Sequence, residues 1–530
     1  MDPHTAGHRR GVVAAPHAAA VEAGHAILAA GGNAIEAMVA MAAVIAVTYP
    51  HMNQFGGDGF WLVREPSGRM RALMAAGAAG SRARPELYRE AGFDDIPPRG
   101  PLAALTVPAA VAGWMLALEA ARAHGGKLPL ADLLAAATAH ARTGFATSRS
   151  QAECTAYAAS GLKAAPGFAK TFLVDGKPPP QGSLLRQAAL AATLEHLTHA
   201  GLDDFYRGDV GREIAADLER IGSPVTREDL ERCRARVAEP LSVELAGGTV
   251  FNTPPPTQGL ASLMILALFD RLRVRKSEGF DHIHGLVEAT KRALSVRNRY
   301  LTDPQHLAHP PGRFLERAFL DREAAAIDRD RAAPWPRAGH GDTVWLGAAD
   351  AGGLVVSYIQ SLYWEYGSGC VLPATGVLMQ NRGVAFSLER AALNALSPGR
   401  LPVHTLNPAL AVLADGRIMA YGAMGGDAQP QIQAGLFTRH VGFRMPLPEA
   451  LDHPRCVLGQ TWGAPRASLL VEARFEEALV AELRAAGHHV EMLGEPYADS
   501  MGHAGAVLLH PDGTLEGAHD PRADGGAAGL

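Results

Sequence analysis

The chain has 530 residues, of which 48% are apolar and 19% are charged, with 58 glycines and 36 prolines. This composition is that of a globular protein with a large core and many turns, and it excludes a disordered or fibrous chain. The 49 basic and 54 acidic residues are interspersed and leave a net charge of −5, so no nucleic-acid groove or polybasic membrane patch is predicted.

The cysteines and the N-terminus predict a soluble, cytoplasmic protein. The four cysteines are far apart and form no CxxC pair, which argues against a disulfide framework or a zinc site. Met1–Leu28 lacks the charged-then-apolar order of a signal peptide, and the most apolar run, Ala37–Val47, is too short to span a bilayer. We expect no metal, no cofactor, no membrane contact and no nucleic-acid partner.

The first half of the chain is expected to be mainly helical. Residues 18–47 predict two helices separated by a Gly-Gly break, with Asn33 and Glu36 forming a capping box at the second. A glycine-rich turn and two strands follow in His51–Ala76. Residues 108–245 carry apolar residues at three- and four-residue spacing, and Gly279–Leu301 predicts one more helix.

The pattern changes between residues 303 and 342. This segment carries several prolines and many charges, so we expect a long loop with at most a short helix, either functional or mobile. After Thr343 strands predominate, including one in Gly376–Asn381, and a last helix is expected over Phe475–Gly487. Helices followed by strands predict an α+β layered protein.

Several common sites are excluded by inspection. The sequence holds no GxxxxGK[ST] phosphate loop, no HExxH zinc helix and no GxSxG serine elbow. Gly367–Gly376, "GSGCVLPATG", is a glycine-rich turn, because its spacing does not fit a dinucleotide motif.

Thr343 is the first residue after the loop and the first of an expected strand. A threonine is a poor nucleophile unless a base lies beside it. If the Asp342–Thr343 bond were cut, the new α-amino group, with an ordinary pKa of about 7.7, would lie next to the Thr343 hydroxyl. One residue would then supply both nucleophile and general base.

Motifs along nearly the whole chain carry a resemblance. They are "AGHAILAAGGNAIEAMVAMAAVIAVTYPHMNQFGGDGFWLV", "LTVPAAVAGW", "DTVWLGAADAGGLVVSYIQSLYWEYGSGCVLPATGVLMQN", "YGAMGGD" and "LEGAHDPRADGGAAG". They resemble the γ-glutamyltranspeptidase family of N-terminal nucleophile (Ntn) hydrolases. The resemblance implies an α+β fold, a four-layer αββα sandwich formed by two chains cut from one precursor. Residues 1–342 would be the large subunit, ending in the loop 303–342, and residues 343–530 the small subunit.

The resemblance also assigns roles to residues. Thr343 matches the nucleophile, which would first attack the Asp342 carbonyl in self-cleavage. Ser361 matches a threonine whose hydroxyl bonds the nucleophile, and Gly425 with Gly426 match the turn that forms the oxyanion hole. Alternatives remain at this point: a hairpin turn for the glycines, and a solvent-facing position for Ser361. The glycines of Gly56–Gly59 are expected to shape the backbone.

The residues that hold a γ-glutamyl group in transpeptidases are replaced. The carboxylate-binding arginine position falls near Ala76, and the ammonium-binding aspartate position is Ala385. A Ser-Ser pair appears as His404-Thr405, and an asparagine appears as Tyr363. Because an unpaired ammonium in a pocket is costly, glutathione is not the expected substrate.

The segments "GDTVWLG", "SYIQSLYWEYGSG" and "QNRG" most resemble the oxamate amidohydrolase-like branch of the family. This implies hydrolysis or acyl transfer of a small acid amide. A γ-glutamyl hydrolase or transpeptidase, and an uncleaved non-enzymatic binding relative, remain alternatives. Two cleaved subunits would form an α/β heterodimer, and a dimer of heterodimers is left open. Candidate substrate contacts are Tyr363, Asn381, Arg382, His404 and Thr405, with a surface charge as the alternative for Arg382 and a core residue for His404.

Overall fold

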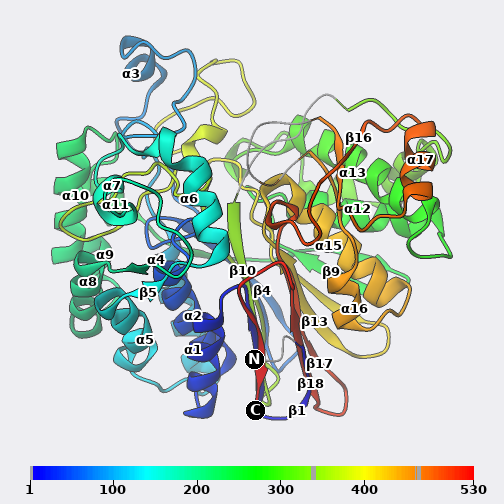
Figure 1. Cartoon of the computed structure of the whole chain (residues 1–530), viewed down its shortest axis with the longest axis horizontal. Coiled ribbons are helices and arrows are strands. Elements are labelled where there is room, and N and C mark those ends of the chain that lie inside the picture. Colours follow the sequence, from blue (N-terminus) through cyan, green and yellow to red (C-terminus); the bar gives the residue numbers. More distant parts are fainter. Residues whose placement is uncertain (1–3, 336–341, 460, 462–466) are drawn as a thin grey trace.

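The computed structural model of this protein describes residues 4–335, 342–459, 461 and 467–530. Two seven-stranded sheets are stacked face to face, and helices cover the outer face of each (Figure 1). The α+β class and the four-layer αββα order predicted from the sequence are therefore confirmed.

The first sheet holds the strand that begins at the predicted cleavage site. Its neighbouring strands are all antiparallel, in the order β19-β2-β10-β11-β3-β4-β7. Their bounds are β2 Gly11–Ala15, β3 Asp58–Arg64, β4 Met70–Ala75, β7 Arg236–Ala238, β10 Asp342–Asp350, β11 Val355–Tyr363 and β19 Gly526–Gly529.

The second sheet is also antiparallel throughout, in the order β1-β18-β17-β13-β12-β9-β8. Its strands are β1 His4–His8, β8 Leu241–Leu245, β9 Gly248–Asn252, β12 Ala409–Leu413, β13 Ile418–Ala423, β17 Ala504–Leu509 and β18 Leu515–His519. Smaller sheets pair β5 (Phe145–Ala146) with β6 (Leu184–Leu185), and place β15 (Leu469–Val471) between β14 (Cys456–Leu458) and β16 (Val490–Met492).

Helices of the N-terminal half cover the first sheet. α1 (Ala18–Ala29) and α2 (Ala34–Thr48) form the predicted pair, and Asn33 caps α2 in the predicted capping box with Glu36. All fifteen residues of α2 are buried, because the helix lies between β10 and β11 on one side and other helices on the other. The other helices of this half are α3 Pro85–Glu90, α4 Ala110–Ala123, α5 Leu130–Thr143, α6 Arg149–Leu162, α7 Phe168–Phe172, α8 Ala188–Ala200, α9 Asp204–Arg207, α10 Asp209–Ile221 and α11 Arg227–Arg232.

The second sheet is covered by helices from the middle and the end of the chain. α12 (Gly259–Leu272) and α15 (Gln429–Phe437) contact its strands, and α13 (Phe280–Tyr300) packs on α12. The remaining helices are α14 Arg317–Ala325, α16 Leu447–Asp452 and α17 Glu477–Ala485. Short helical turns occupy Pro304–His306, Pro311–Leu315, Arg382–Ala385, Gly426–Ala428, Thr438–Gly442 and Asp499–Met501.

Three apolar clusters correspond to the three interfaces between the four layers. One joins the N-terminal helices to the first sheet, a second joins α12, α13 and α15 to the second sheet, and the third lies between the sheets. The intersheet cluster includes Phe60 and Trp345 from the first sheet and Leu410 and Val507 from the second. Burial of this much apolar surface is the main force that holds the sheets together.

The segment 303–342 is more ordered than the sequence predicts as far as residue 335. It contains α14 and two short helical turns, and Phe314 and Leu320 join the core beside α12. Ala332 N–H donates to the Ala486 carbonyl at 2.8 Å. Residues 336–341 of the expected loop lie outside the described residues.

The strand predicted for Gly376–Asn381 is not a ladder strand. Its backbone makes single bridges, from Leu378 to Val371 and from Met379 to Gly56. The N–H groups of Gln380 and Asn381 then donate to Gly56 and Leu362. The segment is extended but wraps past the end of β11, so none of the described strands continues alongside it.

Among the helices that the described residues form, none is both long and apolar enough to cross a bilayer.

Candidate active site

Thr343 lies at the start of β10, where the first sheet meets the second. Asp342 pairs with Tyr363 and Val344 with Gln360 on β11, so an irregularity in the register falls at Thr343. The threonine is 1% exposed. The Thr343 hydroxyl faces α15, which packs on the second sheet, because its Oγ1 accepts a hydrogen bond from Gln429 Nε2.

Ser361 lies on β11 beside this position and is 1% exposed, so the solvent-facing alternative does not hold. Its Oγ accepts a hydrogen bond from the Tyr363 N–H at 2.7 Å. Tyr363 has φ +87°, unusual for a bulky residue. A Cβ on Gly57 would lie 2.2 Å from the Ser361 carbonyl oxygen, so glycine there does shape the backbone at this position.

Gly425 and Gly426 follow the end of β13 and lead into α15, so they are not a hairpin turn. Both have positive φ, +117° and +54°, which glycine adopts without strain. A Cβ on Gly425 would meet the Thr461 methyl at 2.6 Å. Consecutive backbone N–H groups in a turn can form an anion-binding concavity, which is the arrangement an oxyanion hole requires.

Gln429 is a site residue that sequence reasoning missed. Its Nε2 donates to Thr343 Oγ1 at 3.1 Å, and its side chain is fully buried. Gln429 begins α15 three residues after Gly426. The only sequence signal is its position three residues after the Gly-Gly pair, since the two partners are 86 residues apart.

The Gly-Gly turn is fixed by Gln258, the residue before α12, and by Arg297 of α13. The Arg297 guanidinium pairs with Asp427, with 2.9 Å between Nη2 and Oδ2, and also donates to Gln258 Oε1 at 2.6 Å. Gln258 Nε2 in turn donates to the carbonyls of Gly426 and Thr405, at 2.7 and 2.6 Å. This buried network joins the turn to one of the candidate substrate contacts.

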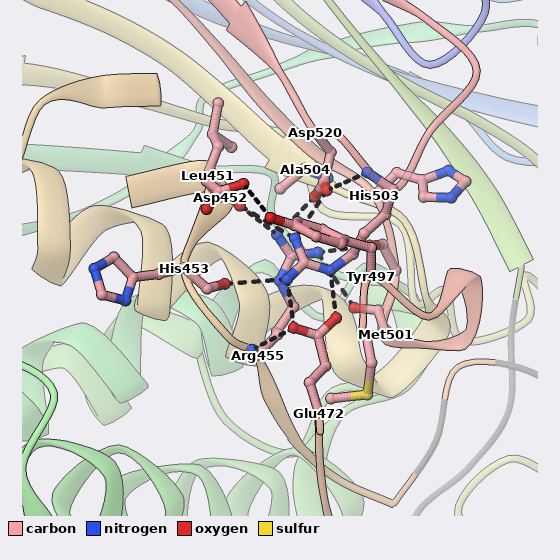
Figure 2. A network of polar contacts seen from close by, with 12 residues as sticks. Leu451, Asp452, His453, Arg455, Glu472, Tyr497, Met501, His503, Ala504 and Asp520 are labelled. Atoms are coloured by element: carbon pink, nitrogen blue, oxygen red, sulfur yellow. Dashed lines mark hydrogen bonds and ion pairs between the residues drawn. The ribbon is translucent and has the colours of Figure 1, made fainter. Parts of the chain in front are cut away.

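A second network fixes the turn from the C-terminal side (Figure 2). The Arg455 guanidinium donates to Asp520 Oδ2 at 2.6 Å and to the Gly502 carbonyl at 2.5 Å. The neighbouring His503 carbonyl accepts from the N–H of Met424, the residue before Gly425, at 2.8 Å. The C-terminal motif of the sequence thus acts on the turn through buried ion pairs.

Arg382 is completely buried, so the surface-charge alternative does not hold. Its guanidinium lies 3.7 Å from the centre of the Tyr363 ring, and Nη1 donates to Thr405 Oγ1 at 3.4 Å. Nε and Nη2 have no hydrogen-bond partner among the described residues. Burial lowers the pKa of Arg382 to about 10, so it stays a cation at neutral pH.

His404 lies beside this arginine, with Nε2 3.2 Å from Asp58 Oδ2. Burial lowers the pKa of His404 to about 4, with Arg382 acting in the same direction, so the imidazole is neutral. Its Nδ1 lacks a partner among the described residues. Asp58, which sequence reasoning also missed, pairs with Ser361 across β3 and β11 and accepts from the Gly77 N–H at 2.9 Å.

Both polar atoms of the Asn381 side chain form hydrogen bonds with nearby backbone groups. Its Oδ1 accepts from the Trp364 N–H at 3.1 Å, and its Nδ2 donates to the Pro98 carbonyl at 3.0 Å. Four of the five candidate contacts, Tyr363, Arg382, His404 and Thr405, therefore form one cluster, while Asn381 holds the loop that carries Arg382.

Within the described residues, one group has the spacing for a metal ion: His284, Glu288 and His488. Its atoms are already engaged. His284 Nδ1 lies 2.8 Å from His488 Nε2, and the Lys291 ammonium donates to Glu288 Oε1 at 2.7 Å. Lys291 also donates to the Ala333 carbonyl, so the group anchors the segment before residue 335.

The family model described as gamma-glutamyltranspeptidase matches residues 20–530. The chain belongs to the γ-glutamyltranspeptidase family. The oxamate amidohydrolase proenzyme of Klebsiella pneumoniae is 51% identical over 522 residues, covering 98% of both chains. The glutathione hydrolase-like YwrD proenzyme of Bacillus subtilis is 36% identical over 98% of both.

Among solved structures, cephalosporin acylase from Bacillus halodurans superposes with a TM-score of 0.91 at 30% identity, over 100% of this chain and 97% of that one. These relatives are hydrolases and acylases by name, and two are named proenzymes. The family resemblance and the Ntn-hydrolase fold predicted from the sequence are confirmed.

Proposed function

We propose that this protein cleaves itself between Asp342 and Thr343 and then hydrolyses the amide of a small acid, of the oxamate class, through an acyl-Thr343 intermediate. The observation that carries the proposal is the Thr343 hydroxyl, buried at the start of β10 and bonded by Gln429 at the end of the Gly425–Gly426 turn.

Self-cleavage would begin with attack of Thr343 Oγ on the Asp342 carbonyl carbon. The C–N bond breaks, the hydroxyl proton passes to the nitrogen, and an ester replaces the amide. Water then hydrolyses this ester to the Asp342 carboxylate and the free Thr343 hydroxyl. The products would be chains 1–342 and 343–530, which remain associated as a heterodimer.

In turnover, the Thr343 α-amino group would take the hydroxyl proton as Oγ attacks the substrate carbonyl. The N–H groups of the Gly425–Gly426 turn would stabilise the oxyanion. The ammonium then gives its proton to the leaving nitrogen, ammonia departs, and water hydrolyses the acyl ester. With oxamate the products are oxalate and ammonia.

The environment of Arg382 favours a substrate that carries a carboxylate. A buried cation without a counter-ion is costly, and a planar carboxylate would satisfy both unpartnered nitrogens in a bidentate pair. Tyr363, which stacks on Arg382, pairs with Asp342 beside the nucleophile, so the acid should be short. His404 and Thr405 would complete the contacts, and Asn381 would hold their loop.

A denaturing gel and a paired assay test this proposal. We expect the purified protein to run as two fragments with an N-terminus at Thr343, Thr343→Ala to run as one chain, and oxamate to release ammonia. A wild-type chain that stays whole would indicate a non-enzymatic relative. Turnover of a γ-glutamyl anilide without turnover of oxamate would show a γ-glutamyl hydrolase or transpeptidase instead.

A further inference from the structure

We propose that Gln429 is a catalytic residue with two functions: its Nε2 holds the Thr343 hydroxyl, and its Oε1 binds the α-amino group that cleavage creates. The inference rests on the proposed function. It adds a group that would orient the general base.

The first observation is an unsatisfied acceptor. Gln429 is fully buried, and its Oε1 has no hydrogen-bond partner among the described residues, although Nε2 of the same amide is bonded to Thr343 Oγ1. A buried carbonyl without a donor loses the hydrogen bond it would make in water. In the uncut chain this cost persists next to the bond that is to be cleaved.

Cleavage supplies the missing donor. In the uncut chain the Thr343 nitrogen is an amide with one hydrogen, whereas after cleavage it is an amine with additional hydrogens. The nitrogen and the oxygen of the Gln429 side-chain amide share one carbon, so an amide whose Nε2 is bonded to Oγ can turn its carbonyl oxygen toward the nitrogen of the same threonine. The acceptor that is unpaired in the precursor would thus be paired in the mature enzyme.

The resulting hydrogen bonds have consistent directions. Gln429 Nε2–H donates to Thr343 Oγ, the Oγ–H donates to the amine nitrogen, and an amine N–H donates to Gln429 Oε1. This ring aims the amine lone pair at the hydroxyl proton, as general base catalysis requires. It also stabilises the negative charge that develops on Oγ during attack.

The backbone of Gln429 is fixed independently of the substrate. The Ala428 N–H donates to the Gly425 carbonyl at 2.8 Å, and Asp427 is held by Arg297. A side chain on so rigid a turn can orient the amine with little loss of entropy at each turnover.

The test uses Gln429→Met and Gln429→Glu in the full-length protein. We expect both variants to cleave. Gln429→Met should lower kcat at least 10-fold with little change in KM, because an oriented donor to the reacting oxygen is lost. Gln429→Glu should move the acidic limb of the kcat–pH profile upward by about one pH unit, because a carboxylate stabilises the ammonium form of the amine.

Gln431→Met is the matched control. Gln431 lies on the same helix and bonds the Asp427 and Leu458 carbonyls rather than Thr343, so its variant should keep the wild-type pH profile. Cleaved Gln429 variants with wild-type kcat and pH profile would overturn the inference. So would variants that remain uncut, because Gln429 would then be required before the amine exists. A wild-type chain that fails to cleave would instead overturn the proposed function.

Discussion

Arg382 is expected to have opposite effects on stability and on substrate binding. As a buried guanidinium with two nitrogens that no described residue bonds, it should destabilise the fold, and as the cation of the cluster it should bind the substrate carboxylate. Stability and substrate binding should therefore respond to its removal with opposite signs.

We expect Arg382→Met to raise the KM for oxamate about 100-fold, the size of a lost charge-assisted pair. The same substitution should leave the free energy of unfolding unchanged or raise it by about 1–4 kcal/mol, since an apolar side chain replaces a buried charge. Steady-state kinetics and denaturant unfolding measure the two effects.

Arg439→Met is the control, because Arg439 is buried but paired with Glu278, with 2.7 Å between Nε and Oε1. Its removal leaves a carboxylate without its partner and should lower the free energy of unfolding by about 3–5 kcal/mol. If Arg382→Met lowered stability equally and left KM unchanged, Arg382 would have a structural role only.

At the scale of elements, the Gly425–Gly426 turn joins the end of β13 to α15 and is fixed from both sides by buried ion pairs. Two separate constraints favour glycine at position 425. Its φ is positive, and an added Cβ would collide with the Thr461 side chain. Gly31, between α1 and α2, has only the first constraint: its φ is +85°, and a Cβ added there would have no atom within 4 Å.

We therefore expect Gly425→Ala to abolish detectable turnover and to cost more stability than Gly31→Ala. The Gly31 variant should lose about 1 kcal/mol from backbone strain alone and keep full activity. Thermal unfolding and the oxamate assay compare the two. If Gly425→Ala lost no more stability than Gly31→Ala and kept its activity, the turn would have no part in catalysis.

Elements with strong local signals were predictable from the sequence. The Gly-Gly break and the Asn33 cap define α1 and α2, and the change in composition at Thr343 marks the start of β10. The contacts that complete the site were not predictable, because Gln429 and Asp58 reach Thr343 and His404 across long stretches of chain. Gly376–Asn381 has strand-like composition, but pairing depends on a neighbour that only the fold provides.

For the whole molecule, buried histidines dominate the expected response to acid. Burial lowers the pKa of His51, His488 and His519 to about 3. It lowers that of His17 and His404 to about 4. These five imidazoles are neutral in the folded protein at pH values where the unfolded chain, with an ordinary pKa of about 6.5, already binds protons.

The unfolded state therefore binds more protons once the pH falls below about 7.5, and the free energy of unfolding should fall as the pH drops from about 7.5 toward 4. His503 opposes this trend, because Asp499 raises its pKa against the effect of burial, but it is one group against five. Denaturant unfolding at pH 8, 6.5 and 5 should show a small loss of stability between the first two, where the unfolded imidazoles begin to bind protons, and a larger loss at the third. A flat profile would contradict the assignment of these histidines as neutral.

The strand order determines whether refolding is unimolecular or bimolecular. In the first sheet β2 lies between β19 and β10, and in the second sheet β1 and β9 flank strands from the other side of Thr343. Folding of the intact precursor is unimolecular. Once the peptide bond before Thr343 is cut, each sheet would be assembled from two molecules, and refolding would become bimolecular. The cut protein should thus have a Tm that rises with its own concentration, whereas uncut Thr343→Ala should not.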